Sequence, residues 1–257
     1  MRLVRFSDAG CTHRGILDAD KVEVVSSDLQ RTGESFPLAD VKLLAPVEPP
    51  DIFAIGLNYR LHADESGAKY PSAPVIFLKA TSSLIGPGDT ILLPAMAPTE
   101  VDWEAELAIV IGSTCHRVSE DNALDFVLGY TCGNDVSARD CQLKLDVQWA
   151  RGKSFDTFCP LGPWIETDLD PDNADITLRL NGEVMQSSNT SDMIFNCRQL
   201  VSYCSHVATL RPGTVIMTGT PRGVGFAKKP PQFLKAGDTV EVEIAGIGTL
   251  TNPVAAE

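Results

Sequence analysis

Two acidic residues stand on what should be one face of an apolar strand. Residues 101–112 read VDWEAELAIVIG, and apolar side chains alternate there with Glu104 and Glu106. This period of two predicts a β-strand, on which the two carboxylates point to the same side, about 6–7 Å apart. Either the strand ends in water and the charges are solvated, or the pair binds a cation.

The cation interpretation predicts a hard divalent ion. Oxygen ligands without His or Cys nearby favour Mg²⁺ or Mn²⁺ over zinc, and a third carboxylate is then expected from another element. Asp135, in GYTCGNDVSARDCQ at 129–142, is the candidate because it follows an apolar strand-like run. The pattern predicts a helix from Asp135, with Arg139 and Gln142 three apart on one face. The alternative makes Asp135 an ordinary helix N-cap that pairs with Arg139.

A histidine and a carboxylate lie three residues apart in GLNYRLHADE, residues 56–65. One helical turn would place His62 beside Glu65. A carboxylate next to an imidazole fixes its tautomer and raises its basicity, an arrangement that can take a proton from water. The alternative is an incidental pair on an exposed helix. The flanking Gly56 and Gly67 would suit a mobile lid.

The elements that must position these groups are mostly strands. Residues 1–45 alternate strand-like pieces with turns, and the Pro-rich LLAPVEPP at 43–50 indicates a linker. We therefore expect a small N-terminal domain over 1–45 and a main domain over 46–257. Strand-like runs in the main domain are DIFAIGL, PVIFLK, TILLP, AELAIVIG, ITLRL, TVIMTG, TVEVEI and GTLTNPV. Helical patterns are limited to about 58–66, 119–128, 135–146 and 192–208.

Composition is that of a globular protein and narrows the choice of partners. Of the 257 residues, 44% are apolar and 21% are charged, which suffices for a sizeable core. The net charge of −13 and the lack of a basic run argue against nucleic acid or an anionic membrane surface as partner. Seven cysteines without metal-binding spacing, and no stretch of signal-peptide type, predict reduced thiols and a cytoplasmic protein.

Several motifs occur together in a fixed order, which is a stronger signal than any one of them. They are GLNYRLHADE, PVIFLKATSSLIGPGD, VDWEAELAIVIG, NDVSARDCQ, KSFDTFCPLGPW, NGEVMQ, and MTGTPRGVG with FLKAGDTVEVEI. From about residue 50 onward the chain resembles the fumarylacetoacetate hydrolase family, in the short form typified by acylpyruvate hydrolases and oxaloacetate decarboxylases. The resemblance implies a mainly β fold with some α, a mixed β-sandwich roll with a small N-terminal α+β unit. It also implies a homodimer.

The resemblance further implies a role for each candidate residue. One group would bind Mg²⁺ or Mn²⁺, a second would activate water and stabilise an oxyanion, and a third would line the acid-binding end of the site. The implied metal ligands are Glu104, Glu106 and Asp135; the catalytic residues are His62, Glu65 and Lys153; and the substrate-binding residues are Arg139, Gln142, Thr220, Gly219 and Lys79.

These roles combine into one reaction on a small 2-oxo acid. Such an acid could chelate the ion through its carboxylate and keto oxygens. We predict hydrolysis of a C–C bond in an acylpyruvate-type 2,4-dioxo acid such as fumarylpyruvate. His62 would deprotonate the attacking water, Lys153 would stabilise the oxyanion, and the ion's charge would lower the energy of the departing pyruvate enolate.

Other reactions share that enolate and stay open as alternatives. They are isomerisation of 2-hydroxyhepta-2,4-diene-1,7-dioate and decarboxylation of oxaloacetate. An alternative of another class is a non-catalytic metal-binding protein of the same fold. Such a protein would not need His62, Glu65 and Lys153.

Overall fold

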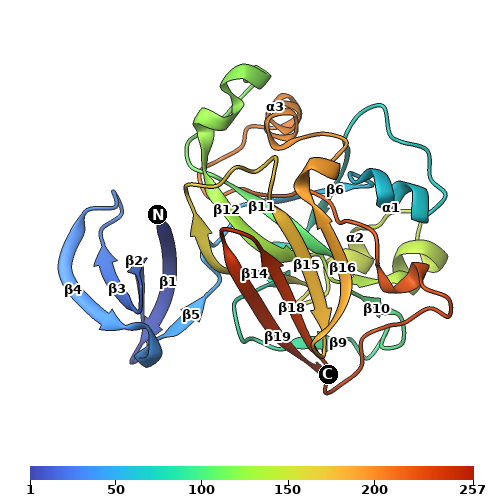
Figure 1. Cartoon of the computed structure of the whole chain (residues 1–257), viewed down its shortest axis with the longest axis horizontal. Coiled ribbons are helices and arrows are strands. Elements are labelled where there is room, and N and C mark those ends of the chain that lie inside the picture. Colours follow the sequence, from blue (N-terminus) through green and yellow to red (C-terminus); the bar gives the residue numbers. More distant parts are fainter.

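The computed structural model describes residues 1–257 and is mainly β, as expected. Its largest sheet has 12 strands, in the order β4-β3-β2-β1-β14-β12-β11-β17-β6-β7, with β5 beside β1 and β8 beside β14 (Figure 1). The acidic strand β11 therefore lies inside the sheet. The strands are β1 (Arg2–Asp8), β2 (Cys11–Asp18), β3 (Lys21–Val25), β4 (Arg31–Pro37), β5 (Lys42–Leu44), β6 (Ile52–Gly56), β7 (Val75–Lys79), β8 (Leu84–Ile85), β11 (Ala105–Ile111), β12 (Val127–Asn134), β14 (Cys159–Glu166) and β17 (Val215–Met217).

A five-stranded sheet in the order β16-β15-β18-β19-β9 packs against β11, β12 and β14. Strand β11 is buried on both faces, against this smaller sheet on one side and against a second core on the other. Leu107 and Ile109 join Ile176 of the smaller sheet in the larger core, whereas Ala108 and Val110 point into a second core. The remaining strands are β9 (Ile91–Leu93), β15 (Asp175–Leu180), β16 (Glu183–Asn189), β18 (Thr239–Ile244) and β19 (Gly248–Ala256), and the short pair β10 (Val101–Asp102) and β13 (Ser137–Ala138).

Helices are few and short, and none is long and apolar enough to span a bilayer. The longest, α3, is capped by Asn196 and Gln199, whose side chains each accept a hydrogen bond from the other's backbone N–H. The α-helices are α1 (Arg60–Glu65), α2 (Ala150–Lys153) and α3 (Cys197–Val207). The other helices are the 3-10 helices η1 (Leu38–Asp40), η2 (Thr81–Ser83), η3 (Glu120–Phe126), η5 (Thr190–Asp192) and η6 (Gly225–Ala227), and the π-helix η4 (Cys141–Leu145).

The helix predicted over 135–146 is confirmed only in its second part: residues 139–145 are helical, whereas residues 135–138 are not. The backbone N–H groups of Asp135 and Arg139 donate to the backbone oxygens of Glu104 and Glu100, each at 2.9 Å. These bonds draw the segment alongside the acidic strand, where β13 pairs with β10. The helical backbone begins at Arg139 and continues through the π-helix η4. The helix predicted over 119–128 is the 3-10 helix η3, and its flanking serine makes no side-chain cap.

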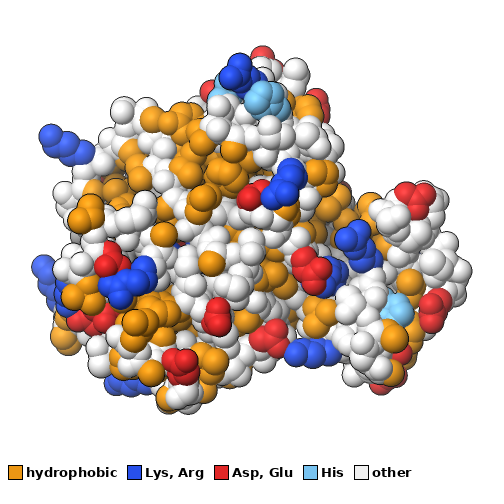
Figure 2. Space-filling model, turned by 180° about the vertical axis from the view of Figure 1, so that it is seen from behind, with side chains coloured by type: hydrophobic (Ala, Val, Ile, Leu, Met, Phe, Trp, Pro, Cys, Tyr) orange, Lys and Arg blue, Asp and Glu red, His pale blue; other side chains and the backbone are white.

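The N-terminal strands β1 to β4 form an antiparallel lobe that joins the large sheet through β1 and β14. Its only helical piece is the 3-10 helix η1, so the lobe is almost wholly β. Phe6 and Val22, both fully buried, belong to a small core of its own. From behind, the lobe projects from the body (Figure 2), and the groove between them, lined by Arg14 and Val47, encloses about 380 Å³.

Candidate metal centre and active-site cavity

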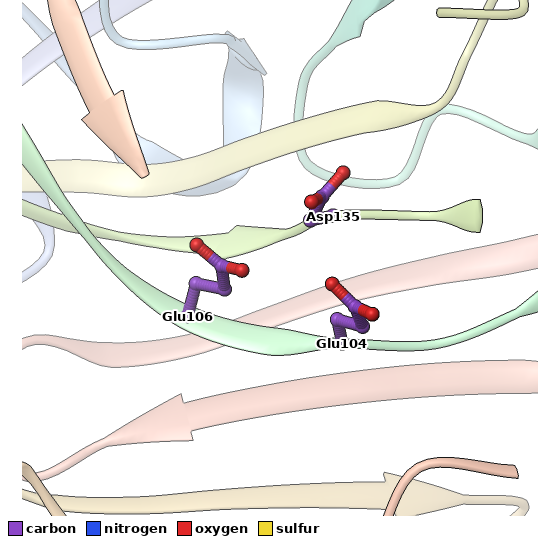
Figure 3. A group of neighbouring side chains, drawn as sticks. All are labelled: Glu104, Glu106 and Asp135. Atoms are coloured by element: carbon purple, nitrogen blue, oxygen red, sulfur yellow. The ribbon is translucent and has the colours of Figure 1, made fainter. Parts of the chain in front are cut away.

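Two neighbouring antiparallel strands bring the three predicted carboxylates together. Glu104 directly precedes β11, Glu106 lies on it, and Asp135 directly follows its partner β12. One ligand oxygen from each lies within 4.8 Å of the other two (Figure 3). The three residues are 6%, 1% and 0% exposed, respectively. A strand end solvated by water is therefore excluded.

Three buried cations neutralise two of these carboxylates. The Nζ atom of Lys153 lies 2.7 Å from Glu104 Oε2 and 2.7 Å from Asp135 Oδ2. Lys79 Nζ lies 2.5 Å from the other oxygen of Asp135, and Arg139 Nη2 lies 2.7 Å from Glu104 Oε1. Burial alone would raise the pKa of Glu104, but Lys153 and Arg139 outweigh it and lower that pKa to about 2. Glu104 is thus held as an anion.

Glu106 has no such partner. Its single hydrogen bond comes from the backbone N–H of Gly219, at 2.8 Å, and no cationic side chain pairs with it. Burial, together with the charges of Asp135 and Glu104, raises the pKa of Glu106 well above its usual value. A divalent cation held by all three carboxylates would remove this repulsion. The all-oxygen donor set therefore fits Mg²⁺ or Mn²⁺.

A cavity of about 270 Å³ lies beside the acidic cluster. Its wall combines carboxylates with one imidazole, one ammonium and one guanidinium group, so acids, bases and hydrogen-bond donors face one space. The predicted residues on the wall are Glu104, Glu106, His62, Lys153, Arg139, Gln142 and Thr220, and those that the sequence did not single out include Phe77, Leu143, Trp149 and Phe226.

His62 lies on α1 and is 6% exposed, so it does not belong to an incidental surface pair. Its Nδ1 atom is 3.7 Å from Glu65 Oε2, longer than a hydrogen bond, and has no hydrogen-bond partner. The Glu65 carboxylate instead accepts the backbone N–H of Gly223, at 2.9 Å to Oε2. Burial would raise the pKa of Glu65, but His62 and this N–H outweigh it and lower the pKa.

A single glycine-rich loop, residues 218–227, connects the parts of the site through its backbone. Positive φ angles of 97° at Gly219 and 101° at Gly223 turn the chain there, and glycine adopts such angles without strain. Thr220 faces the cavity, and its hydroxyl accepts a hydrogen bond from Gln186 of β16 at 2.9 Å. The backbone N–H groups of Gly219, Gly223 and Gly225 donate to Glu106, Glu65 and Asp102, respectively.

Two of the predicted substrate-binding residues, Lys79 and Gly219, do not line the cavity. Lys79 is off the cavity wall because its ammonium group lies behind Asp135, where it also donates to the backbone oxygen of Lys153. Gly219 is also off the wall and positions Glu106 instead. Arg139 does contact Gln142, at 2.8 Å, but its carboxylate partners are Asp102 and Glu104 rather than Asp135.

A family model described as "Fumarylacetoacetate (FAA) hydrolase C-terminal" matches residues 51–255. The chain belongs to the fumarylacetoacetate hydrolase family. A second model, described as "Rv2993c-like, N-terminal", matches residues 1–46. Membership agrees with the fold and with the acidic cluster described above.

Relatives within the fumarylacetoacetate hydrolase family differ in their named reactions. A mitochondrial oxaloacetate tautomerase of Xenopus laevis is 45% identical, over 95% of this chain and 78% of the relative. A 2,4-didehydro-3-deoxy-L-rhamnonate hydrolase of Sphingomonas sp. is 46% identical, over 97% of this chain and 94% of the relative. The crystal structure of a 5-carboxymethyl-2-hydroxymuconate delta-isomerase from Mycobacterium smegmatis is 47% identical and superposes with a TM-score of 0.90, covering 100% of this chain and 99% of that one.

Proposed function

We propose that the protein is a divalent-metal-dependent enzyme that hydrolyses the C–C bond of an acylpyruvate-type 2,4-dioxo acid. The observation that carries the proposal is the buried cluster of Glu104, Glu106 and Asp135, two of whose members open on a cavity that also contains His62 and Lys153. The similarity to a hydrolase of 2,4-didehydro-3-deoxy-L-rhamnonate, a name that describes a 2,4-dioxo acid, supports the same substrate class.

The three carboxylates would hold Mg²⁺ or Mn²⁺, and the bound ion would supply positive charge to stabilise an enolate. Beside Glu104 on the cavity wall, Arg139 and Gln142 offer hydrogen-bond donors for the carboxylate of a 2-oxo acid. Thr220 lies on the same wall. These groups would orient the substrate with its distal carbonyl toward the imidazole.

His62 would act as the general base. Its ring would take a proton from water, whose oxygen bonds to the distal carbonyl carbon. The ammonium group of Lys153 would stabilise the resulting oxyanion. When that oxyanion collapses, the bond between the carbonyl carbon and the adjacent methylene carbon breaks. Its electron pair forms the enolate of pyruvate, which takes up a proton to give the second product.

A second candidate is the tautomerisation of a 2-oxo acid such as oxaloacetate. It is favoured by the 3.7 Å separation of His62 and Glu65, because an imidazole without a hydrogen-bonded carboxylate is a weaker base toward water. Tautomerisation requires only that a proton move between carbon and oxygen. The similarity to the Xenopus laevis tautomerase supports this candidate.

Product analysis separates the two candidates. The protein is incubated with MnCl₂ and either fumarylpyruvate or oxaloacetate, the enol band is followed in the ultraviolet, and pyruvate is measured with lactate dehydrogenase. Hydrolysis gives one pyruvate per fumarylpyruvate consumed. Loss of the oxaloacetate enol band without pyruvate indicates tautomerisation. Activity toward fumarylpyruvate that survives excess EDTA would refute the proposed metal dependence.

A further inference from the structure

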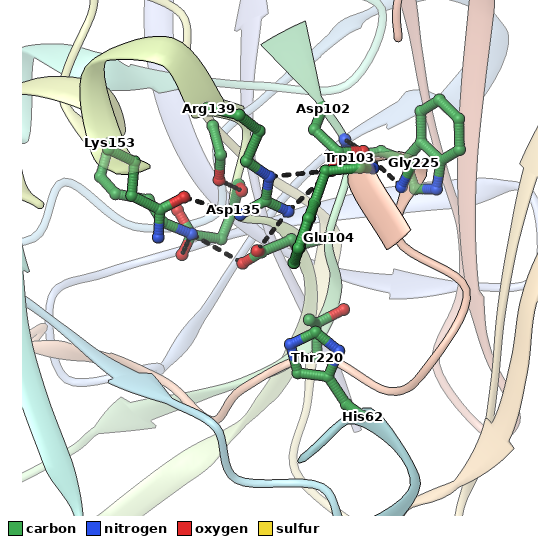
Figure 4. A network of polar contacts seen from close by, with 12 residues as sticks. His62, Asp102, Trp103, Glu104, Asp135, Arg139, Lys153, Thr220 and Gly225 are labelled. Atoms are coloured by element: carbon green, nitrogen blue, oxygen red, sulfur yellow. Dashed lines mark hydrogen bonds and ion pairs between the residues drawn. The ribbon is translucent and has the colours of Figure 1, made fainter. Parts of the chain in front are cut away.

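Asp102 is a fully buried carboxylate that the proposed reaction does not use. It lies on β10, and its Oδ1 atom accepts the backbone N–H of Gly225 at 2.7 Å. Its Oδ2 atom accepts the Nε–H of Arg139 at 2.8 Å and the backbone N–H of Phe226 at 3.1 Å, and it lies 2.8 Å from Nη2 of Arg139. Figure 4 shows these contacts as the outer end of a chain of charges that continues through Arg139 to Glu104. Asp102 thus contacts no face of the cavity but reaches the metal centre through one guanidinium group.

Arg139 is shared between two acids that have different roles. Its Nη2 atom lies 2.8 Å from Asp102 and 2.7 Å from Glu104 Oε1. The ring of Phe226 covers the guanidinium at 4.5 Å, and Nη1 donates to Gln142 at 2.8 Å. The guanidinium is therefore fixed on several sides, and Asp102 supplies two of its contacts.

The second contact of Arg139 is important because Arg139 and a metal ion would compete for the carboxylate of Glu104. A buried guanidinium needs an anionic partner. With Asp102 present, that partner is available away from the metal centre. Without it, Glu104 becomes the only carboxylate in contact with Arg139, and the uncompensated positive charge repels a dication nearby.

We infer that Asp102 is a positioning residue that holds Arg139 and thereby leaves Glu104 able to bind a divalent ion. The inference rests on the proposed metal centre, since Glu104 is one of its three ligands. Asp102 would then raise the affinity for the metal ion in two ways. Its own negative charge attracts the ion directly, and its contact with Arg139 raises the affinity further; only the second effect requires Arg139.

The test is a double-mutant cycle read by Mn²⁺ binding, measured by isothermal titration of each full-length protein with MnCl₂ and no substrate. Asp102→Asn keeps the acceptor for Gly225 but turns an NH₂ group toward Arg139 and toward the backbone N–H of Phe226, and the Arg139→Gln background separates these two effects. We expect about tenfold weaker binding, in the range typical of groups that support metal ligands. Arg139→Gln alone should bind Mn²⁺ more tightly, because it removes a cation from Glu104. In the Arg139→Gln background, Asp102→Asn should weaken binding less than about threefold.

The matched control is Asp51→Asn, which breaks the 2.8 Å ion pair with Arg211 on the surface and should leave Mn²⁺ affinity unchanged. Unchanged affinity in Asp102→Asn, or the same loss with and without Arg139, would overturn the inference alone. If Asp102→Asn does not fold, Arg139→Gln decides: tighter binding supports the inference and weaker binding overturns it. A wild-type protein that binds no Mn²⁺ would overturn the metal centre itself and the proposed function with it.

Discussion

Replacing Glu106 by glutamine should have opposite effects on stability with and without metal. The side chain is 1% exposed, has no cationic partner and accepts only the N–H of Gly219. Glutamine has the same shape and can accept that hydrogen bond, while it removes a charge repelled by Glu104 and Asp135. Without metal, we expect the free energy of unfolding to rise or to change by less than about 1 kcal/mol. Breaking a compensated buried ion pair would instead cost about 3–5 kcal/mol.

With metal bound, wild type should be more stable than Glu106→Gln. An ion present at a hundred times its dissociation constant stabilises a protein by about 2.7 kcal/mol. For a chain of this size each kcal/mol raises the melting temperature by about 2–4 °C, so wild type should gain about 5–11 °C. Glu106→Gln lacks one of the three ligands and should gain less than about 2 °C under the same conditions.

Thermal unfolding followed by circular dichroism, in EDTA and in MnCl₂, measures both effects. Glu183→Gln is the control, because this residue begins β16 with an exposed side chain and should behave as wild type in both solutions. The reasoning fails if Glu106→Gln keeps the full metal-induced gain. It also fails if the variant loses about 3 kcal/mol or more in EDTA, since the carboxylate would then be part of a compensated pair.

Three further predictions concern other residues. His62→Gln should lower kcat by about 10²–10⁴-fold and leave the Mn²⁺-induced gain in melting temperature intact, with exposed His116→Gln as the control; unchanged kcat would exclude His62 as the base. Because the pKa of Glu65 lies below its usual 4.5, its carboxylate stabilises the fold above that pH, and the contribution is lost as the pH falls through the lower folded value. The difference in unfolding free energy between wild type and Glu65→Gln should therefore shrink below pH 4.5, and urea titrations that find it independent of pH would contradict this. Gly129→Ala should cost about 1–3 kcal/mol in urea unfolding, because the added methyl group would clash with the backbone oxygen of Glu166; an unchanged midpoint would speak against it.

The geometry of the two glutamates could be predicted because it is local. A period of two places Glu104 and Glu106 on one side of a strand whatever the rest of the chain does. Burial of β11 depends on the second sheet on one face and on other strands of the large sheet on the opposite face, and the pattern alone specifies neither. Asp102 lies two residues before Glu104, so the same period of two marks this residue as well.

Asp135 follows an apolar strand, as the sequence predicts, but it does not begin a helix. Asp135 reaches the cluster because β12 pairs with β11 and the segment after it hydrogen-bonds alongside Glu104, not because a helix begins there. Helix patterns within one segment take no account of such long-range pairing. For the same reason the contact between Glu65 and the N–H of Gly223 could not be predicted, since 158 positions separate the two residues.

Strand β14 shows where prediction of the fold from sequence patterns ends. Pro160 and Pro163 argue against an interior strand, yet β14 lies between β1 and β12. Its pairing with β12 changes register between Tyr130 and Cys132, and this irregularity accommodates a strand that lacks regular N–H donors. Strands with alternating or continuous apolar residues, such as β11 and β18, were predicted, whereas this one depended on its neighbours.

The cavity is built from parts that differ in how freely they can change. Glu104 and Glu106 are anchored at a strand enclosed by two cores, so moving them would disturb most of the protein's interior. Leu143 and Phe226 also line the cavity but belong to the π-helix η4 and the short 3-10 helix η6, outside both sheets, where side chains can be exchanged at little cost to the sheets. Such a division would allow the shape of the cavity to change while the carboxylate cluster stays in place, and relatives that are named as a tautomerase, a hydrolase and an isomerase could then share one scaffold.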